Sequence, residues 1–166
     1  MKNLYLFDID GTLANIDHRR VHLQDGKNDW KTFNSLMAQD TPNDQIFRIF
    51  KNMFFDHSSD NSIGIPLLVS GRSNDFRYET FKWVRNHLGL IPSFERTKTL
   101  FESMYMRPSG DYRPDEVVKK DLLFHIRKDY PNKKIMGVFD DRPKVIKMWR
   151  ENGLFVFDCS QGVDDF

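Results

Sequence analysis

Two pairs of aspartates stand directly after apolar stretches of the chain. Asp8 and Asp10 follow Leu4–Phe7, and Asp140 and Asp141 follow a second apolar run. Residues i and i+2 of an extended chain point the same way, so Asp8 and Asp10 converge on one space. Four carboxylates in one pocket repel each other unless a cation lies among them. Because every ligand is an oxygen, we expect a hard divalent ion, Mg²⁺ first.

Buried strands are expected to position these side chains. Apolar runs of strand length occur at Leu4–Phe7, Ile63–Val69, Ile135–Phe139 and Leu154–Phe157. Helical patterns occur at Asp29–Gln39, Pro42–Phe55, Asp75–Leu88, Pro114–Asp129 and Pro143–Asn152. First helical positions are expected at Pro42, Pro114 and Pro143, and C-terminal caps at Gly89 and Gly153. The alternation predicts an α/β fold, a doubly wound parallel sheet with helices on both faces.

Polar residues also follow a third strand, where Ser70, Gly71 and Arg72 come after the apolar run. In open α/β sheets, ligands bind beyond the carboxyl ends of the strands. A single Asp at a strand end more often caps a helix or forms a turn. Three strands that bring a hydroxyl, a guanidinium and carboxylates to one edge predict a functional site instead.

The aromatic residues in the expected helices before residue 63 have helical spacing, which favours core packing over a base-stacking surface. These residues are Trp30, Phe33, Phe47, Phe50, Phe54 and Phe55.

Four motifs resemble, in order, those of the haloacid dehalogenase superfamily of phosphotransferases. They are FDIDGTLA at 7–14, LVSGR at 68–72, Lys119 in an expected helix, and VFDDR at 138–142. The segments DIDGTLANIDHRR, LVSGRSNDFRYETFKWV, MRPSGDYRPDEVVKK and DDRPKVIKMWRENG are similar to the 3′-phosphatase domain of phage-type polynucleotide kinase/phosphatase. The resemblance implies one domain over residues 1–166, a Rossmann-like sheet, and a helical insertion over about residues 15–62.

The resemblance also implies catalytic roles. Asp8 would attack phosphorus and form an aspartyl-phosphate. Asp10 would protonate the leaving oxygen and later accept a proton from water, so it should hold a proton near neutral pH. Mg²⁺ would be bound by the Asp8 side chain, the Asp10 backbone carbonyl and either Asp140 or Asp141.

The resemblance further implies the residues that bind substrate. Lys119 would hold a phosphate oxygen as a point charge, and Asp115, four residues earlier, would orient it. The other implied substrate-binding residues are Gly11, Thr12, Arg19, Ser70, Gly71, Arg72, Arg107 and Arg113. Residues 72–134 carry 14 Lys and Arg against 9 Asp and Glu, whereas the whole chain has a net charge of +1. This basic middle suits DNA or RNA 3′ ends.

Two other functions remain open at this point. A small-molecule phosphatase such as a nucleotidase would use the same Asp8, Asp10, Lys119 and Asp140. A catalytically inert module that binds nucleic-acid ends would have no need for Asp8 or Asp10. The choice between DNA and RNA, activity on 2′,3′-cyclic phosphate and the oligomeric state also remain open.

Composition and missing motifs narrow the class of protein to which the chain can belong. The chain is 39% hydrophobic and 30% charged, with one cysteine, Cys159, and no apolar signal or membrane segment, so we expect a cytoplasmic protein without membrane contact. It contains no GxxxxGK[ST] phosphate loop, so we expect no 5′-kinase activity. A separate kinase or ligase partner remains open.

Overall fold

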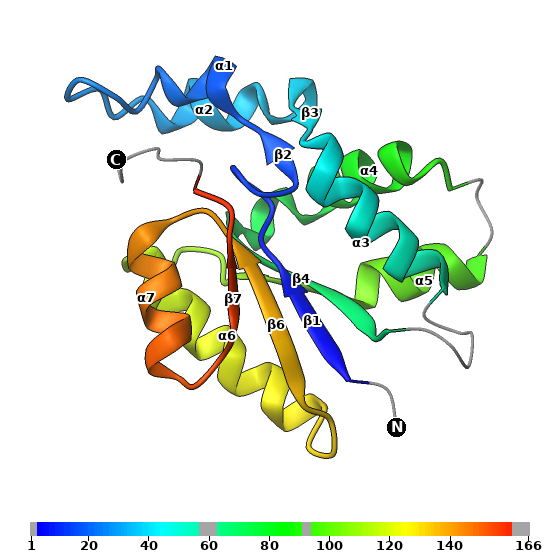
Figure 1. Ribbon diagram of the computed structural model, residues 1–166. Coiled ribbons are helices and arrows are strands. Elements are labelled where there is room, and N and C mark those ends of the chain that lie inside the picture. The colour runs from blue at the N-terminus through cyan, green and yellow to red at the C-terminus, as the bar shows by residue number, and fades with distance from the viewer. Residues whose placement is uncertain (1–2, 57–62, 91–93, 161–166) are drawn as a thin grey trace.

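The sheet at the centre of the protein contains five parallel strands (Figure 1). The computed structural model describes residues 3–56, 63–90 and 94–160. The strands of the central sheet are β1 (Leu4–Phe7), β4 (Ile65–Ser73), β5 (Met104–Arg107), β6 (Ile135–Asp140) and β7 (Val156–Asp158). Two short strands, β2 (Ala14–Asn15) and β3 (Thr41–Pro42), form a separate two-stranded sheet. The helices are α1 (Asp17–Arg20), α2 (Trp30–Ser35), α3 (Asp44–Asp56), α4 (Arg77–Leu88), α5 (Phe94–Glu102), α6 (Asp115–Asp129) and α7 (Pro143–Glu151), with short 3₁₀ turns η1 (Met37–Gln39) and η2 (Asn74–Phe76).

The strand order β5-β4-β1-β6-β7 places β1 at the centre, paired in parallel with β4 and β6. The chain runs from β1 to β4 and β5 on one side, and then crosses through α6 to β6 on the other side. The direction of winding therefore reverses around β1, and this is where ligands bind in such sheets. The predicted doubly wound α/β fold is confirmed.

The two faces of the sheet have separate apolar cores because alternate residues of a strand point to opposite faces. Leu4 and Leu6 of β1 pack with α6 and α7, around the fully buried Trp149. Phe7 points the other way and packs with α3, α4 and α5, against Phe50. Helices thus cover both faces, as predicted.

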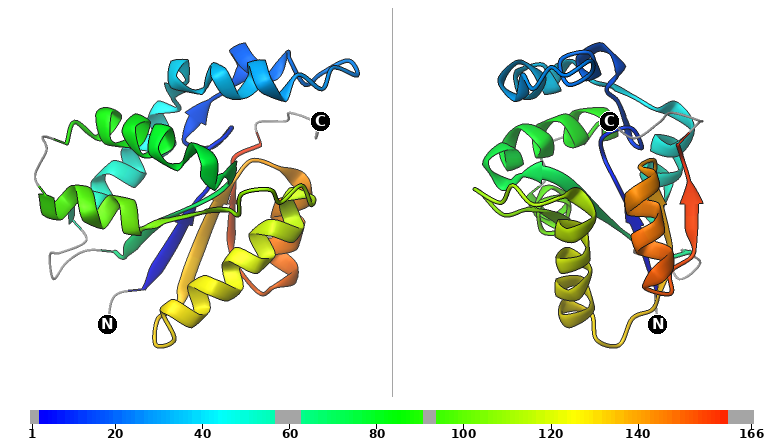
Figure 2. Two further views of the ribbon diagram at one scale, coloured as in Figure 1. Left: turned by 180° about the vertical axis from the view of Figure 1, so that it is seen from behind. Right: turned by 90° about the vertical axis from the view of Figure 1, so that its left-hand side faces the viewer.

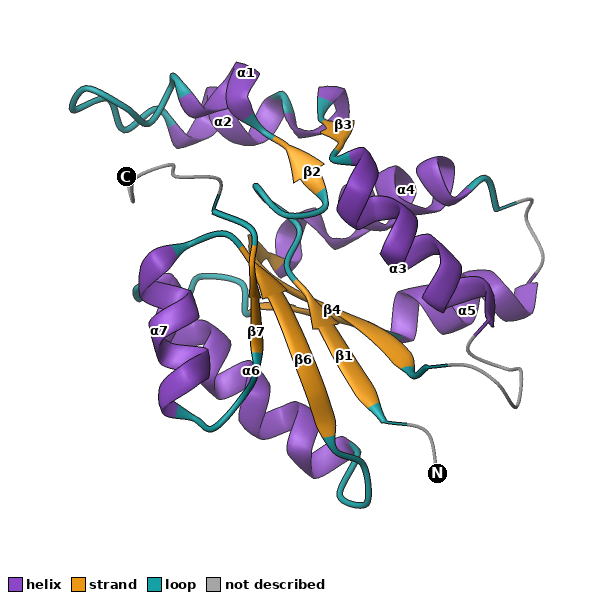
Figure 3. Ribbon diagram, viewed as in Figure 1, coloured by secondary structure: helices purple, strands orange, loops and turns teal. Residues whose placement is uncertain are grey.

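Within the segment between β1 and β4, the part that contains α1 and α2 forms a cap over the carboxyl edge of the sheet, whereas α3 packs on one face of the sheet. Figure 2 shows α1 and α2 above the upper ends of the strands in two further views, and Figure 3 shows β2 and β3 joining this cap to the sheet. The cap and α3 together correspond to the insertion expected over about residues 15–62, of which 57–62 lie outside the described residues.

The predicted helix at Pro42 is wrong at its start, because Thr41 and Pro42 pair with β2 in an antiparallel ribbon. Asn43 explains the difference. Its side-chain amide donates to the carbonyls of Gly11 and Thr12 at 3.0 and 2.9 Å, so this segment lies against the turn after β1. The helix, α3, begins only after that anchor.

Other boundaries also differ from the predictions. The helix predicted over Asp29–Gln39 divides into α2 and η1. The strand predicted over Ile63–Val69 is β4, which extends to Ser73, and the strand predicted over Leu154–Phe157 is β7, which runs from Val156 to Asp158. The elements β5 and α5 were not predicted. Pro114 precedes α6 as its N-cap, whereas Pro143 is in the first turn of α7 and Gly89, with φ of 71°, caps α4 as predicted.

The aromatic residues of the cap and α3 mainly form core, as predicted. Phe33, Phe47, Phe50 and Phe54 are buried, whereas Trp30 is 55% exposed. In the described ranges, no helix has the length and apolar character needed to cross a membrane.

Candidate active site

The carboxyl ends of β1, β4 and β6 bring the predicted polar residues together. Asp8 follows the last residue of β1, Ser70 lies near the end of β4, and Asp140 ends β6. All three side chains are at most 4% exposed, although each is polar. Buried polar groups are normally retained only where partners satisfy them, so this edge is a built site and not a solvated surface.

Lys119 connects the carboxylates of Asp8 and Asp140. Its ammonium donates to Asp8 at 2.7 Å and to Asp140 at 2.9 Å, and Asp115 lies 3.6 Å away. Burial by itself would lower the pKa of Lys119, but the charges of Asp140 and Asp8 outweigh it and raise that pKa well above its usual value. Lys119 is therefore a permanent cation inside the site. Asp115 and Lys119 share one helical face, as the spacing predicted.

Three carboxylates lie close enough to hold one metal ion. Oxygen atoms of Asp8, Asp140 and Asp141 lie within 4.8 Å of one another. Burial, followed by the charge of Asp140, raises the pKa of Asp141 to about 6, and burial raises the pKa of Asp8 well above its usual range. Like charges that raise each other's pKa are stabilised when a cation enters. The donor set, all oxygen, fits Mg²⁺.

The fourth carboxylate, Asp10, lies apart from this group, whereas four had been expected to share one pocket. Arg19 Nη2 lies 2.6 Å and Arg72 Nε 2.9 Å from Asp10 Oδ1. Burial works to raise the pKa of Asp10, but these two arginines outweigh it and lower the pKa to about 2. Asp10 is therefore ionised in the unliganded protein, and the expectation that it holds a proton near neutral pH is wrong for this state.

Asp40 was not identified from the sequence, yet it organises both arginines. Its carboxylate accepts from Arg19 Nε and Nη2 and from Arg72 Nη2, each at 2.7 Å. The side chain of Asp40 is fully buried, and Trp83 Nε1 donates to its backbone carbonyl at 2.7 Å. Two buried guanidinium ions, the buried carboxylate of Asp40 and the partly exposed carboxylate of Asp10 thus form a charge-balanced network. An isolated Asp in a loop carries no motif that would have revealed this role.

Arg19 is held on a second side by an aromatic ring. Its guanidinium carbon lies 4.2 Å from the centre of the Phe33 ring in α2, and the arginine itself is fully buried. A cation over an aromatic face is attracted by the ring's electrons. The cap therefore supplies both Arg19 and the ring that fixes its position.

Neighbouring carboxylates leave no room for a side chain at the two glycines predicted to lie in the site. A Cβ on Gly11 would lie 2.0 Å from Asp141 Oδ2, and the φ of Gly11 is +89°. A Cβ on Gly71 would lie 2.1 Å from Asp115 Oδ1. Either substitution would displace a carboxylate of the site. Both glycines therefore lie in the predicted site, packed against its acidic residues.

Thr12 and Ser70 have well-defined partners. Thr12 Oγ1 donates to Asp141 Oδ1 at 3.1 Å, and Ser70 Oγ accepts from the backbone N–H of Arg72 at 3.2 Å. Their hydroxyls therefore lie beside the carboxylates and arginines described above.

The predicted arginines of the basic middle are placed differently. Arg107 Nη2 lies 3.2 Å from Asp115 Oδ1, one ion pair from Lys119. Arg113 instead pairs with Asp111 at 2.6 Å and with Asp121 at 2.9 Å, and half of its side chain is exposed. The structure thus joins Arg107 to the site but places Arg113 in a surface ion-pair cluster.

Asp140 also accepts a hydrogen bond from Trp149 Nε1 at 3.0 Å, a contact that was not predicted.

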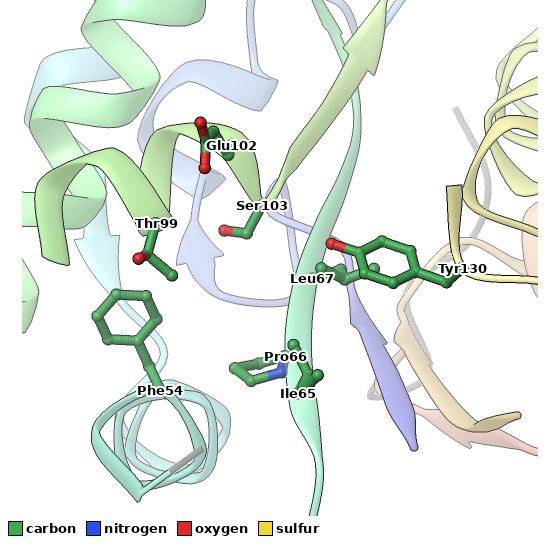
Figure 4. A pocket seen from close by; sticks show the side chains of 8 residues that line it. All are labelled: Phe54, Ile65, Pro66, Leu67, Thr99, Glu102, Ser103 and Tyr130. Carbon is green, nitrogen blue, oxygen red and sulfur yellow. The ribbon is translucent and has the colours of Figure 1, made fainter. Parts of the chain in front are cut away.

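A small cavity of about 100 Å³ lies at the opposite, amino end of β4. Figure 4 shows Ile65, Pro66 and Leu67 of β4 on one of its sides and Phe54 and Thr99 on another. It contains none of the carboxylates or arginines of the site, so we assign it no catalytic role.

The fold and the site together define a class of enzyme. A central parallel sheet with two aspartates after β1, a hydroxyl near the end of β4, a buried lysine, and two aspartates at the end of β6 is the arrangement of haloacid dehalogenase-type phosphatases. The protein is a hydrolase of this phosphatase class.

The chain belongs to a particular family within this class, the polynucleotide kinase PNKP phosphatase domain, whose family model matches residues 2–166. A curated relative, the putative bifunctional polynucleotide kinase/RNA ligase of Autographa californica nuclear polyhedrosis virus, is 29% identical over 147 residues, which cover 88% of this chain and 17% of the relative.

Two solved structures share the fold. A chain of the "Pnkp1/Rnl/Hen1 RNA repair complex" has a TM-score of 0.65 and 24% identity, and a chain of the "Pnkp1/Rnl/Hen1 complex" has a TM-score of 0.66 and 23% identity. Each match covers all of this chain but 44% and 48% of the matched chains. This chain therefore spans less than half the length of these three relatives.

Proposed function

We propose that this chain is a Mg²⁺-dependent phosphatase that hydrolyses the terminal 3′-phosphate of DNA or RNA through an aspartyl-phosphate intermediate. The observation that carries the proposal is the contact of Lys119 with both Asp8 and Asp140, beside Asp141. The family match supports a polynucleotide as the substrate.

The chemistry proceeds in two displacements. An Asp8 oxygen forms a bond to phosphorus while the bond from phosphorus to the 3′-oxygen of the sugar breaks. Asp10 is ionised in the unliganded protein, so in this proposal the negative charge of the bound phosphate raises its pKa, it takes up a proton from solvent when the substrate binds, and it gives that proton to the 3′-oxygen. A water molecule then attacks the phosphoryl-Asp8 and transfers a proton to Asp10, so inorganic phosphate leaves and Asp8 is restored. Lys119 contacts Asp8 directly, so its charge stabilises the phosphoryl oxygens during both steps.

Asp8, Asp140 and Asp141 would hold the metal, together with the backbone carbonyl of Asp10. When bound, Mg²⁺ supplies positive charge that offsets the charge of the phosphoryl oxygens. Arg19 and Arg72 keep the Asp10 carboxyl turned away from the three acidic ligands. In this proposal Asp10 transfers protons, whereas Asp8, Asp140 and Asp141 bind the metal and Asp8 is also the nucleophile.

We also propose that the single domain over residues 1–166 works beside a separate kinase or ligase. The name of the viral relative includes polynucleotide kinase and RNA ligase, and one of the matched complexes is named an RNA repair complex. A 3′-phosphatase prepares the 3′-hydroxyl end that a ligase requires, so these activities belong in one repair sequence.

The proposed function is tested by comparing substrates. We expect kcat/KM to be higher for a short 3′-phosphorylated oligonucleotide than for a 3′-mononucleotide, and the advantage to shrink with salt, at a slope of about −0.7 per contacted phosphate for a single strand. The same protein should transfer no phosphate from ATP to a 5′-hydroxyl end. Faster turnover of mononucleotides would instead identify a nucleotidase, and binding of 3′ ends without turnover would identify a binding module.

The metal site makes a second prediction, which concerns stability. Asp141→Asn should raise the melting temperature of the metal-free protein, by about 5 °C for about 2 kcal/mol, because the fold disfavours an ionised Asp141 at neutral pH. The same substitution should abolish or strongly reduce the stabilisation that Mg²⁺ gives to the unsubstituted protein. Thermal melts with Mg²⁺ and with a chelator measure both effects.

Asp158→Asn is the matched control, because Asp158 pairs with Asp140 in the sheet register but is exposed. It should leave the Mg²⁺-induced shift unchanged. An unchanged shift in Asp141→Asn, or full activity after exhaustive chelation, would contradict the metal assignment.

A further inference from the structure

The loop between β5 and α6, residues 108–114, is tied down on both sides of Tyr112. Arg107 Nη1 donates to the backbone carbonyls of Asp111 and Arg113, at 3.2 and 2.7 Å. Arg107 Nε donates to the carbonyl of Gly71 at 2.7 Å, which fastens this loop to the end of β4. One guanidinium thus fixes the backbone before and after Tyr112.

The Tyr112 side chain itself is 94% exposed. Within the described residues it makes no hydrogen bond, ion pair or ring contact, whereas every other exposed aromatic side chain packs on a neighbouring ring. Those pairs are Trp30 with Phe33, Tyr78 and Phe101 with Phe81, Phe124 with His125, and Phe155 and Phe157 with each other. Tyr112 therefore combines a fixed backbone with a ring that has no partner.

Arg107, which anchors the loop of Tyr112, is also linked to the phosphate site. Arg107 Nη2 lies 3.2 Å from Asp115 Oδ1, Asp115 Oδ2 lies 3.6 Å from Lys119 Nζ, and Lys119 Nζ lies 2.7 Å from Asp8. The anchor of the loop is thus connected to the proposed nucleophile through one carboxylate and one ammonium. The loop that carries Tyr112 is therefore fastened to the same charged network that contacts Asp8.

The surroundings of Tyr112 match those of single-strand binding sites. Arg107 and Arg113 lie beside it, and Arg142 pairs with Asp115 at 3.4 Å. Such sites combine cations that follow the phosphates with aromatic rings on which bases stack. A ring on a fixed backbone also loses little conformational freedom when a base binds.

We propose that Tyr112 is a base-stacking residue, whose ring contacts one nucleobase among the last three nucleotides of a 3′-phosphorylated strand. This inference rests on the proposed function and adds the contact that distinguishes a polynucleotide end from a small phosphate ester.

The test compares four proteins on two kinds of substrate. The proteins are the unsubstituted chain, Tyr112→Ala, Tyr112→Phe and, as a matched control, Phe124→Ala, which removes a similarly exposed ring at 68% exposure from α6. The substrates are a short 3′-phosphorylated oligonucleotide and three versions of it, each with an abasic site at one of the last three positions. The measured quantity is kcat/KM, with the melting temperature as a check of folding.

Tyr112→Ala should lower kcat/KM on the complete oligonucleotide by about tenfold, as expected for one lost stacking contact. Tyr112→Phe and Phe124→Ala should retain normal values. On one of the three abasic substrates, Tyr112→Ala and the unsubstituted protein should become equal, since the stacking base is then missing.

Equal activity of Tyr112→Ala and the unsubstituted protein on the complete oligonucleotide would overturn the inference alone. So would a tenfold loss that persists on all three abasic substrates, because the loss would then come from the loop. If the unsubstituted protein hydrolyses none of these substrates in the presence of Mg²⁺, the proposed function fails, and the inference fails with it.

Discussion

Replacing Asp8 with asparagine is expected to reduce turnover of a 3′-phosphorylated oligonucleotide by more than about 1,000-fold, as for other lost nucleophiles. An amide has no charged oxygen to attack phosphorus. The replaced group also lies 2.7 Å from Lys119 and within the three-carboxylate group, so the metal would lose a charged ligand as well.

The same substitution should not destabilise the fold. The raised pKa of Asp8 shows that burial and the neighbouring carboxylates disfavour its ionised form, so a neutral side chain of the same shape removes repulsion. Lys119 keeps Asp140 at 2.9 Å and Asp115 at 3.6 Å as partners. We therefore expect an unchanged or higher melting temperature together with lost activity.

The covalent step can be detected directly. With a substrate labelled in its 3′-phosphate and rapid acid quenching, the unsubstituted protein should carry label, and Asp8→Asn should carry none. Asp158→Asn, which changes an exposed carboxylate on β7, should be labelled normally. A folded Asp8→Asn protein with near-normal turnover would show that Asp8 is not the nucleophile.

Replacing Asp40 with alanine should have the largest effect on stability. Asp40 accepts from both Arg19 and Arg72, and its side chain is fully buried. Without it, two buried guanidinium ions share only Asp10, so one positive charge is left uncompensated. Removing one partner of a buried ion pair costs about 3–5 kcal/mol, which should lower the melting temperature by about 10 °C.

An exposed ion pair provides the control. Lys98 and Glu102 lie 3.7 Å apart, with more than half of each side chain exposed, so Glu102→Ala should change stability by less than about 0.5 kcal/mol. If Asp40→Ala were as mild as Glu102→Ala, the buried network would not contribute to stability as described.

A positioning role for Asp40 predicts more than instability. Arg19 and Arg72 hold Asp10, so the conservative Asp40→Asn protein, measured where it is folded, should lose more activity on a 3′-phosphate end than on an activated aryl phosphate. The poor leaving group needs a proton from Asp10, whereas the activated one does not. Equal losses on both substrates would assign Asp40 to folding alone.

The sequence by itself determined the fold class and most of the site. Apolar runs of strand length alternate with helical patterns. This alternation is a local property of the sequence, so it can be recognised without knowing which residues contact each other in the folded protein. The acidic residues at the ends of β1 and β6 were predictable because parallel strands deliver their following residues to one edge. Asp8, Asp140 and Asp141 lie together for this reason, and Lys119 contacts Asp8 and Asp140 from α6.

Only the tertiary structure decided which charges face each other. Asp8 and Asp10 are two residues apart, yet one contacts Lys119 and the other contacts Arg19 and Arg72, which lowers its pKa to about 2.

Asp40 acquires its role in the same way, because it comes from a loop 21 residues beyond Arg19 and 32 before Arg72. Electrostatic effects depend on distance through space and on burial, and neither is encoded by local sequence patterns. The cap brings Asp40 over the edge of the sheet, so its role as the shared partner of Arg19 and Arg72 exists only in the folded protein.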